Sequence, residues 1–201
     1  MKTLRSNKGF TLVELAIVLV IIGIILGAVL KGQELINNAK IKRLYNQYRE
    51  VLAAVYTYYD KYGKYPGDDP NAATRWSTAT PVPASGNNDG LIGLIGSFTI
   101  NCASGNNTES CQAWYHMRLA NILTGTNTQA PSNPYGGSVG IGYATVQGLT
   151  TMWIGFDNVP GDVCQSIDQM YDDGVYNTGS IRGSGDYTNN PNGVYDLYFR
   201  L

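Results

Sequence analysis

The chain has 201 residues and carries 14 Lys and Arg against 15 Asp and Glu, a formal net charge of −1. From Ala54 onward it has 6 basic and 12 acidic side chains, and binding to nucleic acid requires a basic surface, so no nucleic-acid partner is expected. One histidine and three cysteines, without a Cys-x-x-Cys-His motif, exclude a c-type haem.

The most informative segment is an apolar run of 21 residues from Phe10 to Leu30, which follows a basic leader and ends at Lys31. A secretory signal peptide would have a shorter apolar stretch with a small-residue cleavage site after it, whereas Gly9 precedes this run. At 1.5 Å per residue the run can cross a hydrocarbon core of roughly 30 Å. We therefore predict a membrane span with its basic end in the cytoplasm.

The residues at the start of this run resemble the type IV prepilin signal, which type IV pilins share with the pseudopilins of type II secretion; they are Lys8-Gly9-Phe10-Thr11-Leu12-Val13-Glu14. The resemblance extends over residues 1 to about 62. It implies that a prepilin peptidase removes the leader, residues 1–9, by cutting between Gly9 and Phe10, and that Phe10 is then N-methylated. It also implies a precursor in the inner membrane and an inner-membrane assembly machinery that builds copies of the chain into a filament.

Glu14 stands near the start of the apolar run, where a charged side chain costs roughly 2.5–3.5 kcal/mol to insert into a bilayer. The resemblance implies that its carboxylate pairs, during assembly, with the N-terminal amine that Phe10 carries in a neighbouring subunit. Two opposite charges in a low-dielectric medium relieve each other's burial, which makes such a pair reasonable. The alternative is a carboxylate favoured by the positive end of its own helix.

Glycines are the candidate positions for flexibility in this helix, because no proline occurs before Pro66 although many type IV pilins have one near the end of the span. Gly23 and Gly27 each cost up to about 1 kcal/mol relative to alanine, so they could allow local melting. They also form a Gly-xxx-Gly pair that permits close helix packing. Both interpretations stay open.

The helical pattern continues to Tyr62 with apolar residues spaced three and four apart, so residues 10–30 form a transmembrane or filament-core helix and residues 31–62 its amphipathic half. Residues 63–201 form a glycine-rich and asparagine-rich head. There we predict a helix over Glu109–Leu123 and strands over Val139–Val146, Thr150–Phe156 and Val194–Leu201. The fold class is α+β, with an antiparallel sheet against the long helix, as in the pilin family.

Three cysteines in an exported domain indicate one disulfide and one free thiol. Cys102 and Cys111 flank a short turn-rich loop and are the preferred pair, with Cys164 left free. A bond from Cys164 to either of them is the alternative. The bond would stabilise the head and carry no redox chemistry.

No cofactor is expected with certainty, and structural calcium is the one candidate. Asn87 and Asp89 lie at alternate positions before a glycine, like the first half of a calcium loop, although the bidentate glutamate of an EF-hand is missing. Asp68 and Asp69 could supply carboxylates from a neighbouring loop. A second, weaker cluster is formed by Asp168, Asp172, Asp173 and Gly174. Ordinary Asx turns are the alternative for both.

Catalysis has little support, because no serine or cysteine is linked by a motif to His116. We expect a structural pilin in an extracellular filament, and no enzyme. The alternatives are a type II secretion pseudopilin in a periplasmic pseudopilus, or a minor pilin. A membrane-tethered adhesin that binds through Trp76, Trp114 or Trp153 is a further alternative.

Overall fold

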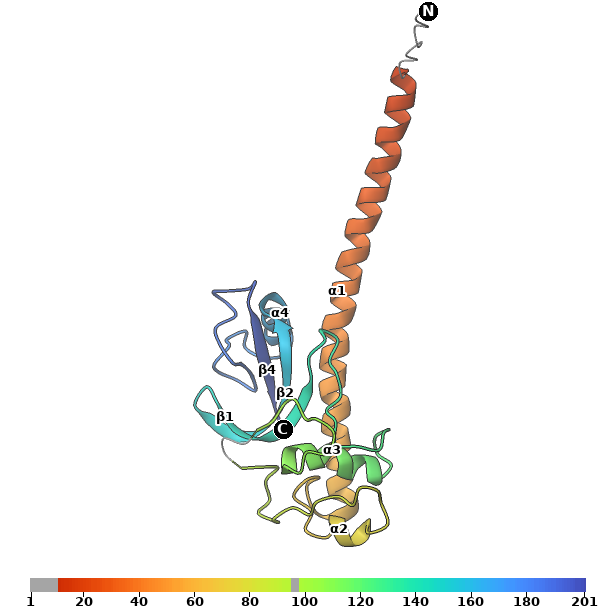
Figure 1. Ribbon diagram of the computed structural model, residues 1–201. Helices are drawn as coiled ribbons and strands as arrows, with labels where there is room; N and C mark the ends of the chain where they lie inside the picture. Colours follow the sequence, from red (N-terminus) through yellow and green to blue (C-terminus); the bar gives the residue numbers. More distant parts are fainter. Residues whose placement is uncertain (1–10, 95–97) are drawn as a thin grey trace, which may run out of the picture. The chain divides into compact units, whose positions relative to one another are not determined.

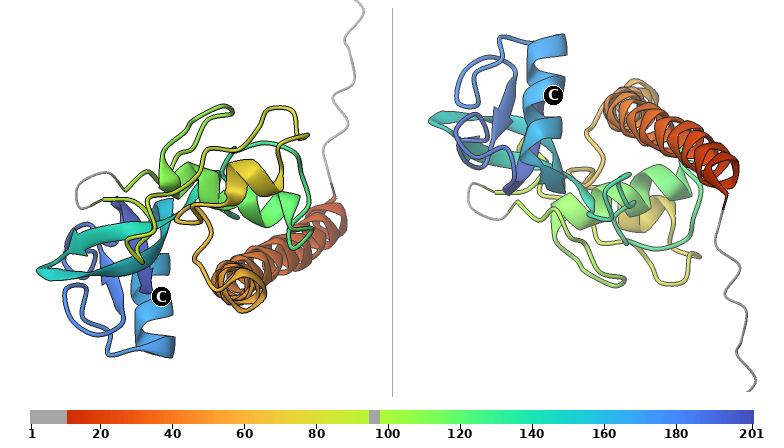
Figure 2. Two further views of the ribbon diagram at one scale, coloured as in Figure 1. Left: turned by 90° about the horizontal axis from the view of Figure 1, so that it is seen from below. Right: turned by 90° about the horizontal axis from the view of Figure 1, so that it is seen from above.

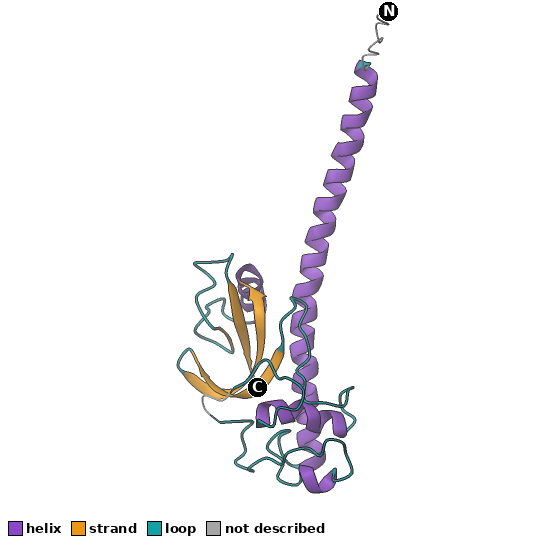
Figure 3. Ribbon diagram, in the orientation of Figure 1, coloured by secondary structure: helices purple, strands orange, loops and turns teal. Residues whose placement is uncertain are grey.

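The computed structural model describes residues 11–94 and 98–201 (Figure 1). The described elements are α1 (Leu12–Tyr62), α2 (Ala72–Arg75), α3 (Glu109–Leu119), β1 (Val139–Val146), β2 (Leu149–Pro160), α4 (Gly161–Tyr171), β3 (Ile181–Gly183) and β4 (Val194–Arg200) (Figure 3). The chain forms two compact units, one that ends at Lys40 and one that extends from Ile41 to Leu201. The predicted α+β class is confirmed.

In the first unit, α1 is a continuous helix with an exposed apolar surface. Leu19 is 69 % exposed and Ile24 is 68 % exposed. The helix passes through Gly23 and Gly27 without interruption, and no other heavy atom lies within 4 Å of a Cβ placed on either glycine. The helix surface at both glycines is therefore open to a neighbouring helix.

In the second unit, the remaining part of α1 packs on the head through one face. Its buried residues recur every three or four positions, which is the period of a helix face: Leu44, Gln47, Val51, Ala54, Val55 and Tyr58. The helix ends where Gly63 adopts a φ of +68°, a left-handed conformation that glycine reaches without steric cost. This packing was predicted from the amphipathic pattern.

The head contains a four-stranded antiparallel sheet with the order β1-β2-β4-β3. β1 and β2 form a hairpin whose two connecting residues, Gln147 and Gly148, both have positive φ angles of 47° and 79°. Such a turn matches the natural twist of the strands and pairs Val146 with Leu149. The ladder between β2 and β4 is irregular between Phe156 and Val159.

The core of the second unit lies where α1, the sheet, α3 and α4 meet. The ring of Phe199 on β4 stacks on Tyr48 of α1 with 4.5 Å between centroids. α3 contacts β1, and α4 contacts β2, β3 and β4 (Figure 2). Trp114 of α3 and Ile154 of β2 are fully buried in the same cluster.

The predicted helices and strands agree with the structure, with several differences, of which the end of β4 at Arg200 instead of Leu201 is the smallest. The helix predicted to reach Leu123 ends at Leu119, because Asn121 adopts a left-handed φ of 58° and breaks the ladder. β2 is longer than predicted and continues to Pro160. The short helix α2, the helix α4 and the three-residue strand β3 were not predicted.

Candidate functional site

Glu14 and Thr11 form a reciprocal capping arrangement at the start of α1. The Glu14 carboxylate accepts hydrogen bonds from the Thr11 backbone N–H and hydroxyl, both at 2.8 Å. The Glu14 N–H in turn donates to Thr11 Oγ1 at 3.2 Å. This is a capping box, which satisfies backbone donors that a helix start leaves unpaired. The Thr-x-x-Glu spacing was visible in the sequence and was missed there.

The two interpretations of Glu14 gain different support from this geometry. The capping box is a local role, as the helix-end alternative expects. The pairing with a neighbour's N-terminal amine concerns a second subunit and stays a prediction. Gly9 and Phe10, the predicted cleavage site, lie outside the described residues.

The helix α1 is long and apolar enough to cross a membrane, judged by its length and composition within the described residues. None of its most apolar window is buried against the rest of the chain. A surface of this kind is unstable in water and requires lipid or another apolar surface.

Cys102 and Cys111 are joined by a disulfide with 5.4 Å between their Cα atoms, which is the pair that the sequence favoured. Cys164 is a free thiol, fully buried in α4. Burial raises the pKa of Cys164, so the thiol stays protonated and unreactive. The bond closes the loop that leads into α3.

Replacing both Cys102 and Cys111 with serine should lower the free energy of unfolding by about 2–3 kcal/mol, because the bond restricts the unfolded chain. Urea unfolding of the full chain in detergent, followed by tryptophan fluorescence, measures this loss. Cys164→Ala provides the comparison without a bond. A double variant as stable as the parent would contradict a structural role for the disulfide.

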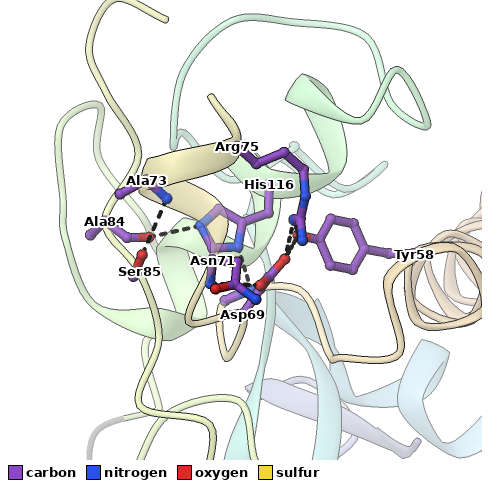
Figure 4. Close-up of polar contacts among 9 residues, drawn as sticks. Tyr58, Asp69, Asn71, Ala73, Arg75, Ala84, Ser85 and His116 are labelled. Atoms are coloured by element: carbon purple, nitrogen blue, oxygen red, sulfur yellow. Dashed lines mark hydrogen bonds and ion pairs between the residues drawn. The ribbon is translucent and has the colours of Figure 1, made fainter. Parts of the chain in front are cut away.

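Asp69 forms a buried polar network with residues of α1 and α2 (Figure 4). Its carboxylate accepts hydrogen bonds from the Tyr58 hydroxyl at 2.7 Å and from the Asn71 N–H at 2.9 Å, and it forms an ion pair with Arg75. The Arg75 guanidinium also lies 4.1 Å from the ring centroid of Tyr62. Burial alone would raise the pKa of Asp69, but the hydrogen bonds from Arg75 and Tyr58 outweigh it and lower that pKa.

In this network the Asp69 carboxylate is directed to Tyr58 and Arg75, so the predicted role of Asp69 in binding calcium gains no support and stays a prediction. Asp68 does lie at the predicted loop, where its carboxylate accepts the N–H groups of Asp89 and Gly90, both at 3.0 Å. Asn87 donates to the Asp89 carboxylate at 2.9 Å. Asx turns also hold the loop, because Asn87 Oδ1 accepts the Asp89 N–H at 3.0 Å and Asp89 Oδ1 accepts the Leu91 N–H at 2.9 Å. Calcium at Asp68, Asn87 and Asp89 stays a prediction.

The second acidic cluster is assembled, with carboxylate oxygens of Asp168, Asp172 and Asp173 within 4.8 Å of one another. Each carboxylate accepts hydrogen bonds from the chain, among them the Gly174 N–H to Asp168 at 3.2 Å and the Ser180 N–H to Asp172 at 2.6 Å. Burial raises the pKa of Asp168, whose other oxygen accepts the Tyr187 hydroxyl. Calcium at this cluster also stays a prediction.

His116 is fully buried on α3 and joins two loops of the head (Figure 4). Its Nδ1 accepts the Gly67 N–H at 3.0 Å, so the proton lies on Nε2, which donates to the Ala84 carbonyl at 2.9 Å. Burial lowers the pKa of His116 to about 4. The described residues around it include no serine or cysteine in hydrogen-bond contact, and the histidine acts as a structural link.

Because His116 is the single histidine, its ring signals in an NMR titration are unambiguous, and we expect an apparent pKa near 4. The unfolded chain takes up this proton below about pH 6.5, whereas the folded chain does not. The neutral His116 ring therefore contributes about 3 kcal/mol to the free energy of unfolding above pH 6.5, and this contribution is lost as the pH falls toward 4. A titration midpoint near 6.5 would show that the ring is solvated.

The three tryptophans do not form a binding platform. Trp114 and Trp153 are fully buried, and Trp153 Nε1 donates to the Ala144 carbonyl at 3.0 Å. Trp76 is half-buried beside Arg75 and Tyr62. The proposed contact of an adhesin through Trp114 or Trp153 is therefore wrong, because core packing covers both rings.

Residues 4–30 match the family described as the prokaryotic N-terminal methylation motif. This match includes the predicted cleavage site and the whole apolar run up to Leu30. No curated protein matches the chain, and no solved structure matches it.

Proposed function

Because the chain carries the prepilin-type N-terminal methylation motif of the type IV pilin and pseudopilin family, we propose that it is a structural subunit of a type IV pilus or related extracellular filament. Proteins with this signal are generally structural and not enzymatic. The observation that carries the proposal is the direct continuation of the motif into α1, a helix whose apolar residues from Leu12 to Leu30 are exposed.

In this function the subunit first waits in the inner membrane, with residues 1–9 as its leader. The prepilin peptidase cuts between Gly9 and Phe10 and methylates Phe10, and the assembly machinery then moves the helix from lipid into the filament. Both environments are apolar, so the hydrophobic gain is small. Close packing at Gly23 and Gly27 and the pairing of Glu14 must then favour assembly.

The head serves as the exposed part of such a filament. Because its composition is acidic, we expect no nucleic-acid partner for it. The disulfide, the Asp69 network and the continuous core stabilise it. A filament subunit outside the cell needs this intrinsic stability.

A pseudopilin or a minor pilin is the second candidate, because the same motif serves both classes. The two classes differ in where the processed chain accumulates. A major pilin is released from cells by shearing as long fibres, whereas a pseudopilin stays in the envelope.

The test is to shear cells that produce the chain, separate the fibre fraction from the envelope, and determine the N-terminus in each by mass spectrometry. We expect most of the processed chain in the fibre fraction, beginning at methylated Phe10. Processed chain that is confined to the envelope would support the second candidate. A chain that retains residues 1–9 in every fraction would contradict both.

A further inference from the structure

A hollow of about 400 Å³ lies beside the C-terminal end of α1. Pockets of this size commonly hold small ligands. This hollow has no role in the packing of the apolar helices or in the cleavage of the leader that are proposed above. It is lined by Tyr59, Gly63, Lys64, Tyr65, Asp68, Asn88, Asp89 and Gly90.

One wall of this pocket is aromatic. The rings of Tyr59 and Tyr65 have centroids 4.8 Å apart and planes tilted by 41°. Tyr59 is 44 % exposed, so part of its ring is free to contact a ligand. A tyrosine ring offers an apolar face and a hydroxyl that can donate and accept hydrogen bonds.

Another part of the lining is a polar loop that hydrogen bonds hold in place. Asp68 is almost fully buried and holds the backbone of Asp89 and Gly90 through its two carboxylate oxygens. Asn88 has a φ of 64°, a conformation that residues other than glycine adopt at a cost. The neighbouring hydrogen bonds keep Asn88 and Asp89 exposed at the pocket without a ligand. A loop fixed in advance loses little freedom on binding.

The charges of the lining select the class of ligand. Lys64 brings a cation, and Asp89 brings a carboxylate close to the buried Asp68. The two carboxylates oppose an anionic ligand. Both oxygens of Asp68 and both oxygens of Asp89 already accept hydrogen bonds from the chain, and Lys64 lies beside them, which weakens pairing with a cationic ligand. A neutral ring with hydroxyl groups satisfies donors and acceptors of both kinds and can place its C–H face on Tyr59.

We propose that this pocket binds a neutral pyranose at the end of a glycan. The site differs from the tryptophan contacts considered above, and it does not depend on filament assembly. The chain would then bind sugar as an isolated subunit in detergent.

The experiment incubates the full chain in detergent micelles with an array of glycans that end in glucose, galactose, mannose, N-acetylglucosamine or sialic acid. We expect saturable binding to at least one neutral terminus, with competition from the corresponding free monosaccharide. Tyr59→Ala should weaken that binding at least about tenfold. The side chain is partly exposed, so circular dichroism should show an unchanged fold.

Tyr56→Ala is the matched control, because Tyr56 lies on the same helix, is 47 % exposed and does not line the pocket. It should keep the affinity within about twofold, well below the loss expected for an anchor residue. Absence of binding to every neutral terminus, retention on sialic acid alone, or equal losses in the two variants would each overturn the proposal. None of these results would affect the proposed filament function.

Discussion

Glu14→Ala is expected to leave the chain cleaved and inserted in the membrane, while the yield of sheared fibres falls at least about tenfold. Removing one partner of a buried charge pair costs about 2–5 kcal/mol, and a single factor of ten corresponds to about 1.4 kcal/mol. The measurement compares fibre and envelope fractions by immunoblot, with the N-terminus determined by mass spectrometry. Normal amounts of regular fibres would contradict the intermolecular pairing.

Two further variants separate that pairing from the capping box. Thr11→Ala removes the hydroxyl that bonds Glu14 but leaves the carboxylate, so fibres should persist if the carboxylate acts between subunits. Glu34→Ala is the control for loss of a carboxylate on the same helix. Glu34 is exposed and pairs with Lys31 at 2.8 Å, and exposed ion pairs contribute little to stability. Loss of fibres in Thr11→Ala to the same extent as in Glu14→Ala, with cleavage intact, would assign Glu14 to helix capping alone.

Asp69→Ala should lower the free energy of unfolding of the head by about 3–5 kcal/mol, because Arg75 and Tyr58 lose their common acceptor. For a chain of this size the melting temperature should fall by about 10 °C. Thermal unfolding of the full chain in detergent, followed by near-ultraviolet circular dichroism, measures the effect. An unchanged melting temperature would mean that water can replace the network.

Asp60→Ala is the matched control, since Asp60 is an exposed carboxylate on α1, and its effect should stay within about 0.5 kcal/mol. The pH dependence gives a second check. The folded pKa of Asp69 is lowered, so its contribution is complete above the ordinary aspartate pKa near 4 and is lost as the pH falls below it. The difference between parent and variant should therefore shrink only at acidic pH.

The elements that sequence analysis predicts well are those with local signals. The alternation in Val139–Val146 predicts β1 to the residue, and a turn with two positive φ angles follows directly. The period of α1 likewise predicts its end at Tyr62. In contrast, α4 has an apolar stripe of only a few residues, such as Val163 and Ile167, and it forms because strands from distant parts of the chain provide its partner surface.

In the candidate site, too, features with a local sequence signal were predicted, and features that depend on distant residues were not. The processing motif and the Cys102–Cys111 pair are short-range features that can be recognised in the sequence. The separation of Asp68 from Asp69 could not be predicted, because it depends on Tyr58 of α1 and on the loop at Asp89. Neighbouring carboxylates in a sequence can therefore serve two different networks.

The most direct test of the filament account is a cryo-electron microscopy structure of fibres sheared from cells that produce this chain. The account predicts a core of α1 helices beginning at Phe10, heads on the outside, and Glu14 within hydrogen-bond distance of the N-terminal amine of a neighbour. Fibres built from another protein, or a core in which Glu14 faces only Thr11 of its own chain, would contradict it.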